Sequence, residues 1–361
     1  MADAPARDWL RLTLVPGVGG ESQRNLLKAF GLPESIFATR ASALAEVVGQ
    51  KLAHQLLNHP VDEAAIASAL NWTQQPGNHL ITLADASYPP ALLTIADPPV
   101  LLYAKGNIEL LKRPAIAMVG SRNATGQGDA IATTFASALA AAGLTVISGL
   151  ALGIDAAAHR GALQERGSTI AVIGTGADRI YPSRNENLAR DIADKGLILS
   201  EFPLGTPAIG SNFPRRNRII AGLAQGVLVV EAAERSGSLI TARLAAESGR
   251  EVFAIPGSIH SPLSKGCHKL IKQGAKLVES AQDVLEELRW EAVVGTPPAS
   301  SPPEDAESRR LLEILGYHPC DLDTLAERAE LTPDKLLAML LPLELSGHVT
   351  QLPGGRYQRI P

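Results

Sequence analysis

The sequence predicts an α/β fold, in which a doubly wound parallel sheet is flanked by a smaller region on each side. From about residue 112 to 290, short apolar runs alternate with helical stretches. Several of these runs are almost continuous Val, Ile and Leu, as expected of strands that are buried on both faces. Gly-marked polar turns follow three of the runs and lead directly into helical patterns. Right-handed crossovers through those helices then give one Rossmann-like sheet.

The predicted strands of this central region follow one another at regular intervals. In chain order they are Ala115–Val119, Leu144–Ile147, Thr169–Ile173, Leu197–Phe202, Val227–Val230, Val252–Ile255 and Lys276–Val278. With the segment that leads into it, the central domain is expected to span residues 76–290.

Residues 1–75 are predicted to form a helical domain. Apolar positions recur at helical spacing from Glu21 to Phe30, directly after a Pro-Gly-Val-Gly-Gly turn at residues 16–20. A Gly-rich turn between two helices resembles a helix-hairpin-helix or SAM-like domain, in which backbone N–H groups bind a DNA phosphate. A tight helix connection that needs positive φ explains the same turn. The following helix offers only Arg24 and Lys28, so both interpretations remain open.

Residues 291–308 are predicted to be a linker, and residues 309–361 a winged-helix-like domain. The segment 295–304 contains four prolines and no large apolar residue, which is typical of an extended, solvated chain that few contacts cross. Three short helical patterns and a hairpin that turns on Gly354-Gly355 follow. Because six Lys and Arg stand against seven Asp and Glu from 309 to 361, a protein contact is indicated at least as much as DNA reading.

The composition excludes several classes of protein. The 33 basic and 37 acidic side chains give a net charge of −4, so any basic surface must be local. Cys267 and Cys320 fit no metal-binding pattern and indicate a reducing compartment. No apolar run is long enough to cross a bilayer. We therefore expect a cytoplasmic protein with no membrane partner and no cofactor.

Gly-marked turns are expected to form a phosphate-binding crevice. The carboxyl ends of parallel strands share one edge of the sheet, where helix N-termini offer unpaired N–H groups to anions. The turns at 120–126, 148–155 and 212–218 belong to this edge, and Ser236-Gly237-Ser238 opens another helix there. Two acidic residues next to it, Glu231 and Glu234, would repel a phosphate unless they pair with Arg235 or Arg243.

Two familiar nucleotide sites are absent from these turns. The turn after the first strand is not G-x-G-x-x-G, and no acidic residue follows the second strand, so a dinucleotide cofactor is not expected. The sequence also lacks G-x-x-x-x-G-K-[ST], which argues against a nucleoside-triphosphate motor.

Basic and aromatic side chains gather in the same region. Residues 202–230 contain no acid but hold Arg215, Arg216 and Arg218, and residues 252–278 contain no acid but hold Lys265 and Lys269. Arginine binds phosphate oxygens with two parallel hydrogen bonds. Phe213 and Tyr181 lie in loops of this region and would stack on unpaired bases, or else anchor the loops on the sheet. Asp155 and His159, one helical turn apart, have the spacing of a catalytic dyad, but an acid in a first helical turn also interacts with the helix dipole.

Six motifs in the central region resemble the DprA/Smf family. They are Met-Val-Gly-Ser-Arg at 118–122, Ser-Gly-Leu-Ala-x-Gly-Ile-Asp-x-x-x-His at 148–159, Gly-Thr-Gly-x-Asp-x-x-Tyr-Pro at 174–182, Ser-Glu-Phe-Pro at 200–203, Asn-Phe-Pro-x-Arg-Asn-Arg-Ile-Ile-Ala-Gly-Leu at 212–223 and Glu-Ala-x-x-x-Ser-Gly-Ser-Leu-Ile-Thr-Ala at 231–242. The resemblance covers about residues 80–280. It implies a recombination mediator, not an enzyme, that binds and protects incoming single-stranded DNA and loads RecA during natural transformation. It also implies a homodimer formed through the Rossmann-like domain.

The family's DNA-binding positions fall on residues already singled out by the pattern. Its Gly-Ser-Arg arginine corresponds to Arg122, and a second basic position, often lysine in the family, corresponds to Arg215. Replacing lysine by arginine keeps the charge and adds a planar fork. The residues expected to bind DNA are Gly120, Ser121, Arg122, Gly149, Gly153, Phe213, Arg215, Arg216, Asn217, Arg218, Ser236, Gly237, Ser238, Lys265 and Lys269.

The alternative to a binding protein is an enzyme. Nucleoside phosphoribohydrolases of the lysine-decarboxylase-like type share this layout and carry P-G-G-x-G-T-x-x-E, whose glutamate acts on the sugar. When that motif is placed on residues 236–241, Ile240 or Thr241 occupies the glutamate position. The missing carboxylate favours binding over hydrolysis. A module that senses a small nucleotide is a third possibility.

Overall fold

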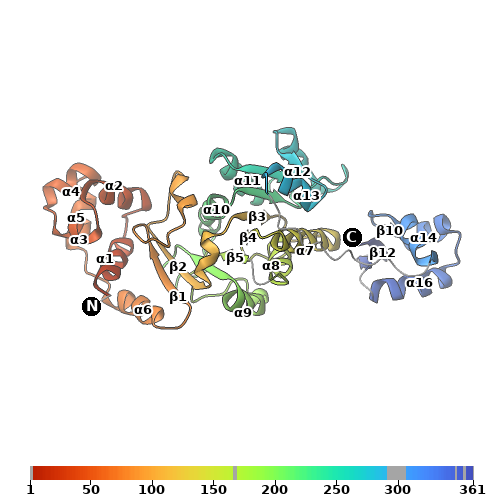
Figure 1. Cartoon of the computed structure of the whole chain (residues 1–361), viewed down its shortest axis with the longest axis horizontal. Helices are drawn as coiled ribbons and strands as arrows, with labels where there is room; N and C mark the ends of the chain where they lie inside the picture. The colour runs from red at the N-terminus through yellow and green to blue at the C-terminus, as the bar shows by residue number, and fades with distance from the viewer. Residues whose placement is uncertain (1–2, 166–168, 291–305, 346–347, 353–354, 361) are drawn as a thin grey trace.

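The computed structural model describes residues 3–165, 169–290, 306–345, 348–352 and 355–360. Three parts follow one another along the longest axis of the molecule: a helical N-terminal part, a central sheet with helices on both faces, and a small C-terminal part (Figure 1). The helices are α1 Asp3–Leu14, α2 Gly20–Phe30, α3 Pro33–Ala38, α4 Ala41–Val48, α5 Gln50–Asn58, α6 Glu63–Thr73, α7 Gly126–Ala141, α8 Ile154–Leu163, α9 Glu186–Lys195, α10 Asn212–Leu223, α11 Ser238–Glu247, α12 Lys265–Lys272, α13 Ala281–Glu287, α14 Ala306–Leu315, α15 Leu322–Ala329 and α16 Pro333–Leu345. The strands are β1 Asn78–Thr82, β2 Leu101–Gly106, β3 Ala115–Val119, β4 Thr145–Ser148, β5 Thr169–Val172, β6 Leu197–Ser200, β7 Gly226–Val229, β8 Glu251–Ala254, β9 Lys276–Leu277, β10 Cys320–Asp321, β11 Val349–Leu352 and β12 Arg356–Arg359.

The central sheet confirms the predicted α/β fold and adds two strands to it. Its order is β1-β2-β6-β5-β4-β3-β7-β8-β9, and all neighbours from β6 to β9 are parallel. The two added strands lie at one edge and are antiparallel, since β1 pairs with β2 and β2 pairs with β6. The order reverses at β3, which lies between β4 and β7.

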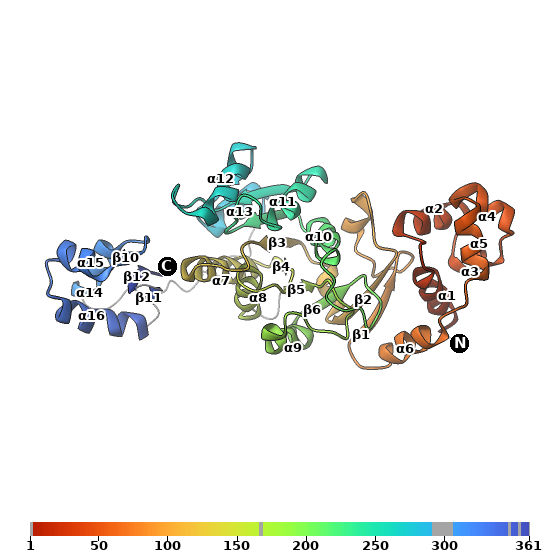
Figure 2. The ribbon, with the colours of Figure 1, turned by 180° about the vertical axis from the view of Figure 1, so that it is seen from behind.

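Alternate residues of each central strand pack against different helices. Ala115, Ala117 and Val119 of β3 belong to one buried cluster with α10, α11 and α12. Ile116 and Met118 of the same strand belong to a second cluster with α7, α8 and α13. The helices therefore cover both faces of the sheet (Figure 2), which explains why these strands are apolar throughout.

The N-terminal helices form a small bundle whose Gly-rich turn lies between α1 and α2. Gly17 in this turn has a φ of 78°, as the tight-connection interpretation requires. Arg24 of α2 forms an ion pair with Asp97 and donates from Nη1 to the carbonyl oxygen of Pro98 at 3.0 Å. This arginine thus attaches the bundle to the segment before β2, whereas Lys28 is exposed.

The C-terminal part is a winged helix. Helices α14, α15 and α16 pack around Leu312, Leu325 and Leu340, and the three-stranded sheet has the order β10-β12-β11. Residues 291–305 of the predicted linker lie outside the described residues. Helix α14 begins at Ala306, so its first residues fall inside the predicted linker range of 291–308. In the described part of the chain, no helix is both long enough and apolar enough to span a membrane.

Candidate nucleic-acid interface

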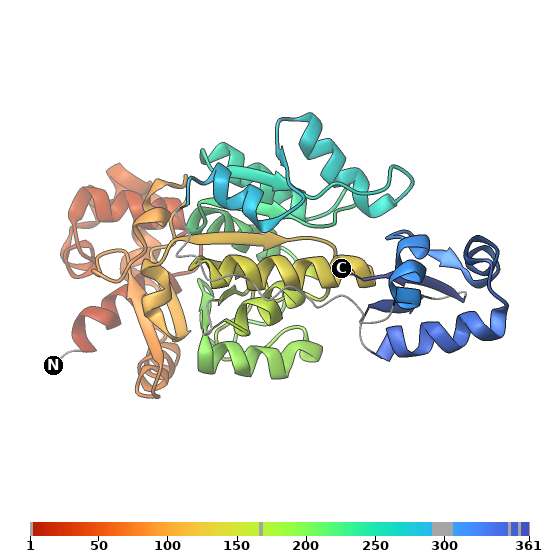
Figure 3. The same ribbon diagram turned by 45° about the vertical axis from the view of Figure 1, so that its right-hand side comes forward.

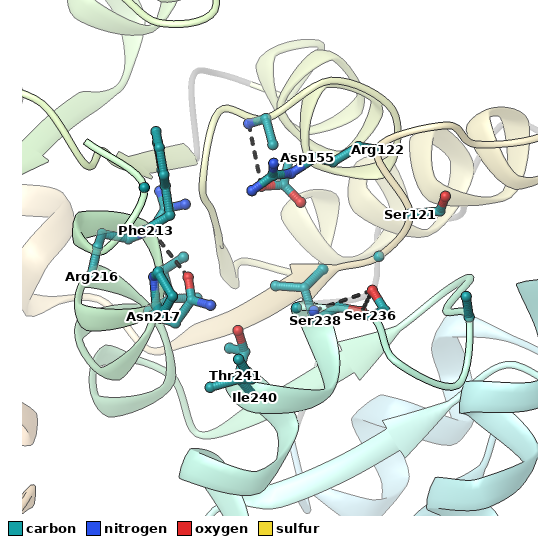
Figure 4. Close-up of a pocket in the computed structure, with 18 of the residues that line it drawn as sticks. Ser121, Arg122, Asp155, Phe213, Arg216, Asn217, Ser236, Ser238, Ile240 and Thr241 are labelled. Atoms are coloured by element: carbon teal, nitrogen blue, oxygen red, sulfur yellow. Dashed lines mark hydrogen bonds between the residues drawn. The ribbon is translucent and has the colours of Figure 1, made fainter. Parts of the chain in front are cut away.

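A cavity of about 680 Å³ lies at the carboxyl ends of β3 and β7, where the strand order reverses. Open α/β sheets bind ligands at this position. Nine of the residues predicted to bind DNA line the cavity, several of them visible in Figure 4: Gly120, Ser121, Arg122, Phe213, Arg216, Asn217, Ser236, Gly237 and Ser238. The Gly-marked turns therefore do meet in one crevice.

The turn after β3 presents Arg122 to the cavity. Ser121 is buried, its Oγ accepts a hydrogen bond from the backbone N–H of Asn123 at 3.1 Å, and its carbonyl oxygen accepts one from Ile154 N–H at 3.1 Å. Arg122 itself is exposed. Within the described residues, it forms no ion pair with a carboxylate. Its guanidinium is consequently available to an anion.

Asp155 and His159 hold the second loop in place. One carboxylate oxygen of Asp155 accepts hydrogen bonds from the N–H groups of Gly149 at 3.1 Å and Ala151 at 3.3 Å. His159 Nε2 accepts one from Leu150 N–H at 3.3 Å, and Leu150 has a φ of 58°. His159 is completely buried. The pair therefore has a structural role, and the dyad interpretation is not supported.

The hydrogen bonds of His159 require a neutral ring. Thr169 Oγ1 donates to the carbonyl oxygen of Val146, so it accepts from His159 Nδ1 at 2.7 Å, and Nε2 must remain unprotonated to accept from Leu150. Burial is the main reason that the pKa of His159 is lowered from 6.5 to about 3.

We therefore expect acid to destabilise the protein through His159. The unfolded chain binds a proton near its ordinary pKa, whereas the folded chain does so only near 3, so stability falls as pH decreases between these two values. The loss by about pH 5 is about 2 kcal/mol. Denaturant unfolding at about pH 7 and pH 5 measures it, with His159→Gln as the comparison. An equal pH dependence in the two proteins would show that His159 is not the cause.

Arg216 forms the floor of the cavity. It is only 4% exposed, and its Nη1 donates to the carbonyl oxygens of Gly149, at 2.8 Å, and Val172. A side chain on Gly149 would lie 2.4 Å from this guanidinium, so the loop approaches the arginine closely only because residue 149 is glycine. Burial lowers the pKa of Arg216 to about 10, and the group remains charged at neutral pH.

Arg218 and Arg215 lie outside the cavity lining, although both are among the residues predicted to bind DNA. Arg218 pairs with Asp97 at 2.9 Å and with Glu201, and its side chain is 12% exposed. It does not line the cavity, and these ion pairs give it a structural role. Arg215 also pairs with Glu201, at 3.3 Å, but is 52% exposed and lies outside the cavity lining. Burial raises the pKa of the Glu201 carboxyl, and Arg218 and then Arg215 oppose that rise.

The loop before α11 lines the side of the cavity nearest β7. Ser236 Oγ lies 2.7 Å from Ser238 Oγ and accepts from Ser238 N–H at 3.3 Å. Nothing lies within 4 Å of a Cβ placed on Gly237, so a phosphate has room to approach. Glu231 pairs with neither of the arginines considered for it, because its carboxylate accepts from the N–H and the hydroxyl of Thr125 at 3.0 and 2.6 Å.

Three planar groups lie in sequence along the rim of the cavity. The rings of Tyr181 and Phe213 have centroids 5.6 Å apart with a 37° angle between their planes. The Arg122 guanidinium lies 5.8 Å from the Phe213 centroid. Tyr181 is 50% exposed. The aromatic pair therefore presents ring surface next to a free cation.

The two lysines predicted to converge on this crevice do not reach it. Lys269 lines a neighbouring cavity of about 800 Å³ between α11 and α12. Lys265 is exposed at the start of α12 and lines neither cavity.

Several lining residues were not predicted. Asn123 and Ala151 belong to the turns that were recognised, and Arg235 lies between the two cavities and lines both. The position of Arg235 directly before Ser-Gly-Ser was the available signal. In the described part of the chain, no three His, Cys, Asp or Glu residues are grouped so as to hold a metal ion.

Comparisons with known proteins agree with this architecture. The family model for DNA recombination-mediator protein A matches residues 79–289, and the model for the DprA winged helix domain matches residues 295–355. Protein Smf of Escherichia coli K12 is 41% identical over 355 residues, which cover 96% of this chain and 94% of that protein.

Two solved structures are similar as well. The X-ray structure of DNA processing protein A from Streptococcus pneumoniae has a TM-score of 0.69 and 41% identity, over 77% of this chain and 95% of that one. The DNA processing protein A of Helicobacter pylori, whose structure is described as revealing a unique single-stranded DNA binding mode, has a TM-score of 0.54 and 32% identity, over 59% and 97% of the respective chains.

Proposed function

Because the chain belongs to the DNA recombination-mediator protein A (DprA/Smf) family, we propose that the cavity at β3 and β7 binds single-stranded DNA. The observation that carries the proposal is the arrangement of Arg122, Phe213 and Tyr181 along one rim, above the buried charge of Arg216. It offers cations to the backbone and ring faces to unpaired bases, as a single strand requires. The solved structure of the H. pylori relative is described in terms of that protein's single-stranded DNA binding mode. The proposed DNA-binding unit is the domain 76–290.

The phosphate contacts in this proposal come from two arginines, Arg122 and Arg215, and the buried charge of a third lies below them. Arg122 is exposed and Arg216 lies at the cavity floor, while Arg215 stands outside the cavity on α10, half exposed, and would meet the strand as it leaves. Hydrogen bonds from an ionised donor to phosphate are the strong class of such contacts. The N-terminus of α11, with its open Gly237, adds N–H groups on the opposite side.

We expect the ring of Phe213 to contribute to the affinity for single-stranded DNA by stacking on a base. Phe213→Leu should lower the affinity for single-stranded DNA by about tenfold, the effect of one stacked base, and leave the salt dependence unchanged. Phe213→Tyr keeps the ring and is the matched control, expected to bind as the parent does. Fluorescence anisotropy with a labelled oligonucleotide measures both. Equal binding by the leucine variant would remove stacking from the proposal.

Within this proposal, the bound strand is protected and passed to RecA in the cytoplasm, during natural transformation. The test is the rate of RecA filament growth on single-stranded DNA, with and without the protein. The proposal expects faster growth that Arg122→Glu abolishes. A rate that the protein leaves unchanged would restrict its role to binding.

We further propose that two chains associate through their Rossmann-like domains. The short edge strand β9, where Leu277 is 43% exposed, and the partly apolar cavity between α11 and α12 support this proposal. Two DNA cavities in one dimer would raise avidity for a single strand without any new contact. Light scattering of the full chain decides it, and a monomer at the concentrations used for DNA binding would contradict it.

The enzyme alternative is not favoured by the cavity. Ile240 and Thr241 both line it, where a phosphoribohydrolase would need a carboxylate. We propose binding without hydrolysis. Release of free base from nucleoside monophosphates that Arg122→Glu abolishes would reverse this conclusion.

A further inference from the structure

The winged helix touches the first turn of α7, and both contacts come from one cross-strand pair. Gln358 Nε2 donates to Gln127 Oε1 at 2.6 Å. Thr350 Cγ2 lies 3.1 Å from the position of a Cβ on Gly126. Thr350 and Gln358 are partners in the β11–β12 ladder, so their side chains project from the same face of the hairpin. Figure 3 shows this part of the molecule beyond the end of α7.

The contact lies beside the proposed DNA site. Gly126 and Gln127 are the first residues of α7, and Arg122 is in the turn that leads into it. Thr125 between them caps the helix and binds the carboxylate of Glu231. Among the described residues, none of the winged helix lines the cavity itself. The hairpin thus leaves the cavity open and covers the surface next to one of its rims.

The docked part has no net positive charge. Residues 309–361 carry six basic and seven acidic side chains. Arg359 donates to the carbonyl oxygen of Leu312 at 3.3 Å and lies 4.8 Å from the centre of the Tyr317 ring, and Lys335 lies 4.0 Å from Glu307. Its main effect on a strand leaving the cavity at this rim is therefore steric.

One polar atom at this contact, Gln358 Oε1, lacks a hydrogen bond to any described residue. Gln358 is 3% exposed, so this acceptor is buried. A buried acceptor without a partner costs about 1–3 kcal/mol, which offsets part of the stabilisation that the docked position gains from the Gln358–Gln127 hydrogen bond.

We propose that the winged helix is a reversible cover over the first turn of α7, next to the rim of the cavity that carries Arg122, and that a single strand longer than the cavity displaces it. This proposal rests on single-stranded DNA binding by the cavity. It predicts that locking the cover in place weakens the binding of long strands only.

A disulfide between Gly126→Cys and Thr350→Cys provides the lock. The Cβ position on Gly126 lies 3.9 Å from Thr350 Cβ, within the range of about 3.5–4.5 Å found in disulfides. Cys267 and Cys320 are both free and buried, and burial raises the pKa of the Cys267 thiol to about 12, so neither should compete. The two single-cysteine variants are the controls.

The measurement compares oxidised and reduced protein, by anisotropy, on oligonucleotides of about 4 and about 16 nucleotides. We expect the disulfide to form in the folded protein. Oxidation should then lower the affinity for the longer strand by about tenfold, which is roughly the effect of losing one stacked base. The short strand should bind equally to both forms. Gln127→Ala, which removes only the contact across the interface, should bind the longer strand more tightly than the parent.

Each other result has a distinct meaning. Failure of the disulfide to form would overturn the docked position. A disulfide that forms but leaves long-strand binding unchanged would overturn the cover alone. If the unmodified protein bound neither strand, the proposed function would fail, and this proposal with it.

Discussion

Arg122→Glu is expected to lower the affinity for single-stranded DNA by about a hundredfold, or about 2.7 kcal/mol. Arg122 is exposed in the turn after β3 and has no carboxylate partner among the described residues. A hydrogen bond to a charged group contributes about 1.5–3 kcal/mol, and the new carboxylate would also repel the phosphate. Arg216, the nearest buried cation, would not compensate because its Nη1 is bonded to backbone carbonyls.

The control for this variant is Arg190→Glu. Arg190 is exposed on α9, and its replacement changes the net charge by the same amount at a site that does not line the cavity. Its pairing with Glu186 is an exposed one, which contributes little to stability. Arg215→Glu should weaken binding less than Arg122→Glu, because Glu201 already shares Arg215. Unchanged affinity in both Arg122→Glu and Arg215→Glu, measured by anisotropy, would remove the DNA site from this position.

Gly153→Ala is expected to lower the free energy of unfolding by about 3 kcal/mol, with about 1–3 kcal/mol from backbone strain and the rest from overlap. Gly153 has a φ of 73° and a ψ of −127°, a conformation that only glycine adopts readily. A Cβ there would lie 2.3 Å from the carbonyl oxygen of Ser121 and 2.8 Å from that of Arg122. These are backbone atoms, so relief of the overlap must displace the turn that presents Arg122.

Gly237→Ala is the matched control for stability. Gly237 belongs to another turn of the same cavity, but its φ is −62° and nothing lies within 4 Å of an added Cβ. We expect it to unfold at the same denaturant concentration as the parent. A Gly153→Ala protein that is as stable as Gly237→Ala would show that the turn tolerates a side chain at residue 153.

The sequence was sufficient to predict the parallel part of the sheet and the turns of the cavity. Strands such as β3 and β7 are uninterrupted apolar runs because both of their faces are buried. The edge strand β1 has the sequence Asn-His-Leu-Ile-Thr, which has too few apolar residues to indicate a strand. The turns at Gly120 and Gly149 could be predicted because each glycine lies between a buried apolar strand and a helical pattern.

The roles of the individual arginines required the structure. Arg215, Arg216 and Arg218 are close together on one helix, yet α10 directs them to solvent, to the cavity floor and to an ion pair, respectively. A count of charges along the chain found no acid from 202 to 230. It missed Glu201, one residue outside that window, and Asp97, which approaches Arg218 only through the fold.

DNA binding by this cavity is tested most directly by titrating the unmodified protein with single-stranded and duplex DNA of equal length over a series of salt concentrations. We expect tighter binding of the single strand, because paired bases cannot reach the rings of Phe213 and Tyr181. We also expect log K to fall linearly with log salt, with a slope of about −0.7 for each phosphate contact. Equal or tighter binding of the duplex, or an affinity that does not depend on salt, would contradict this proposal.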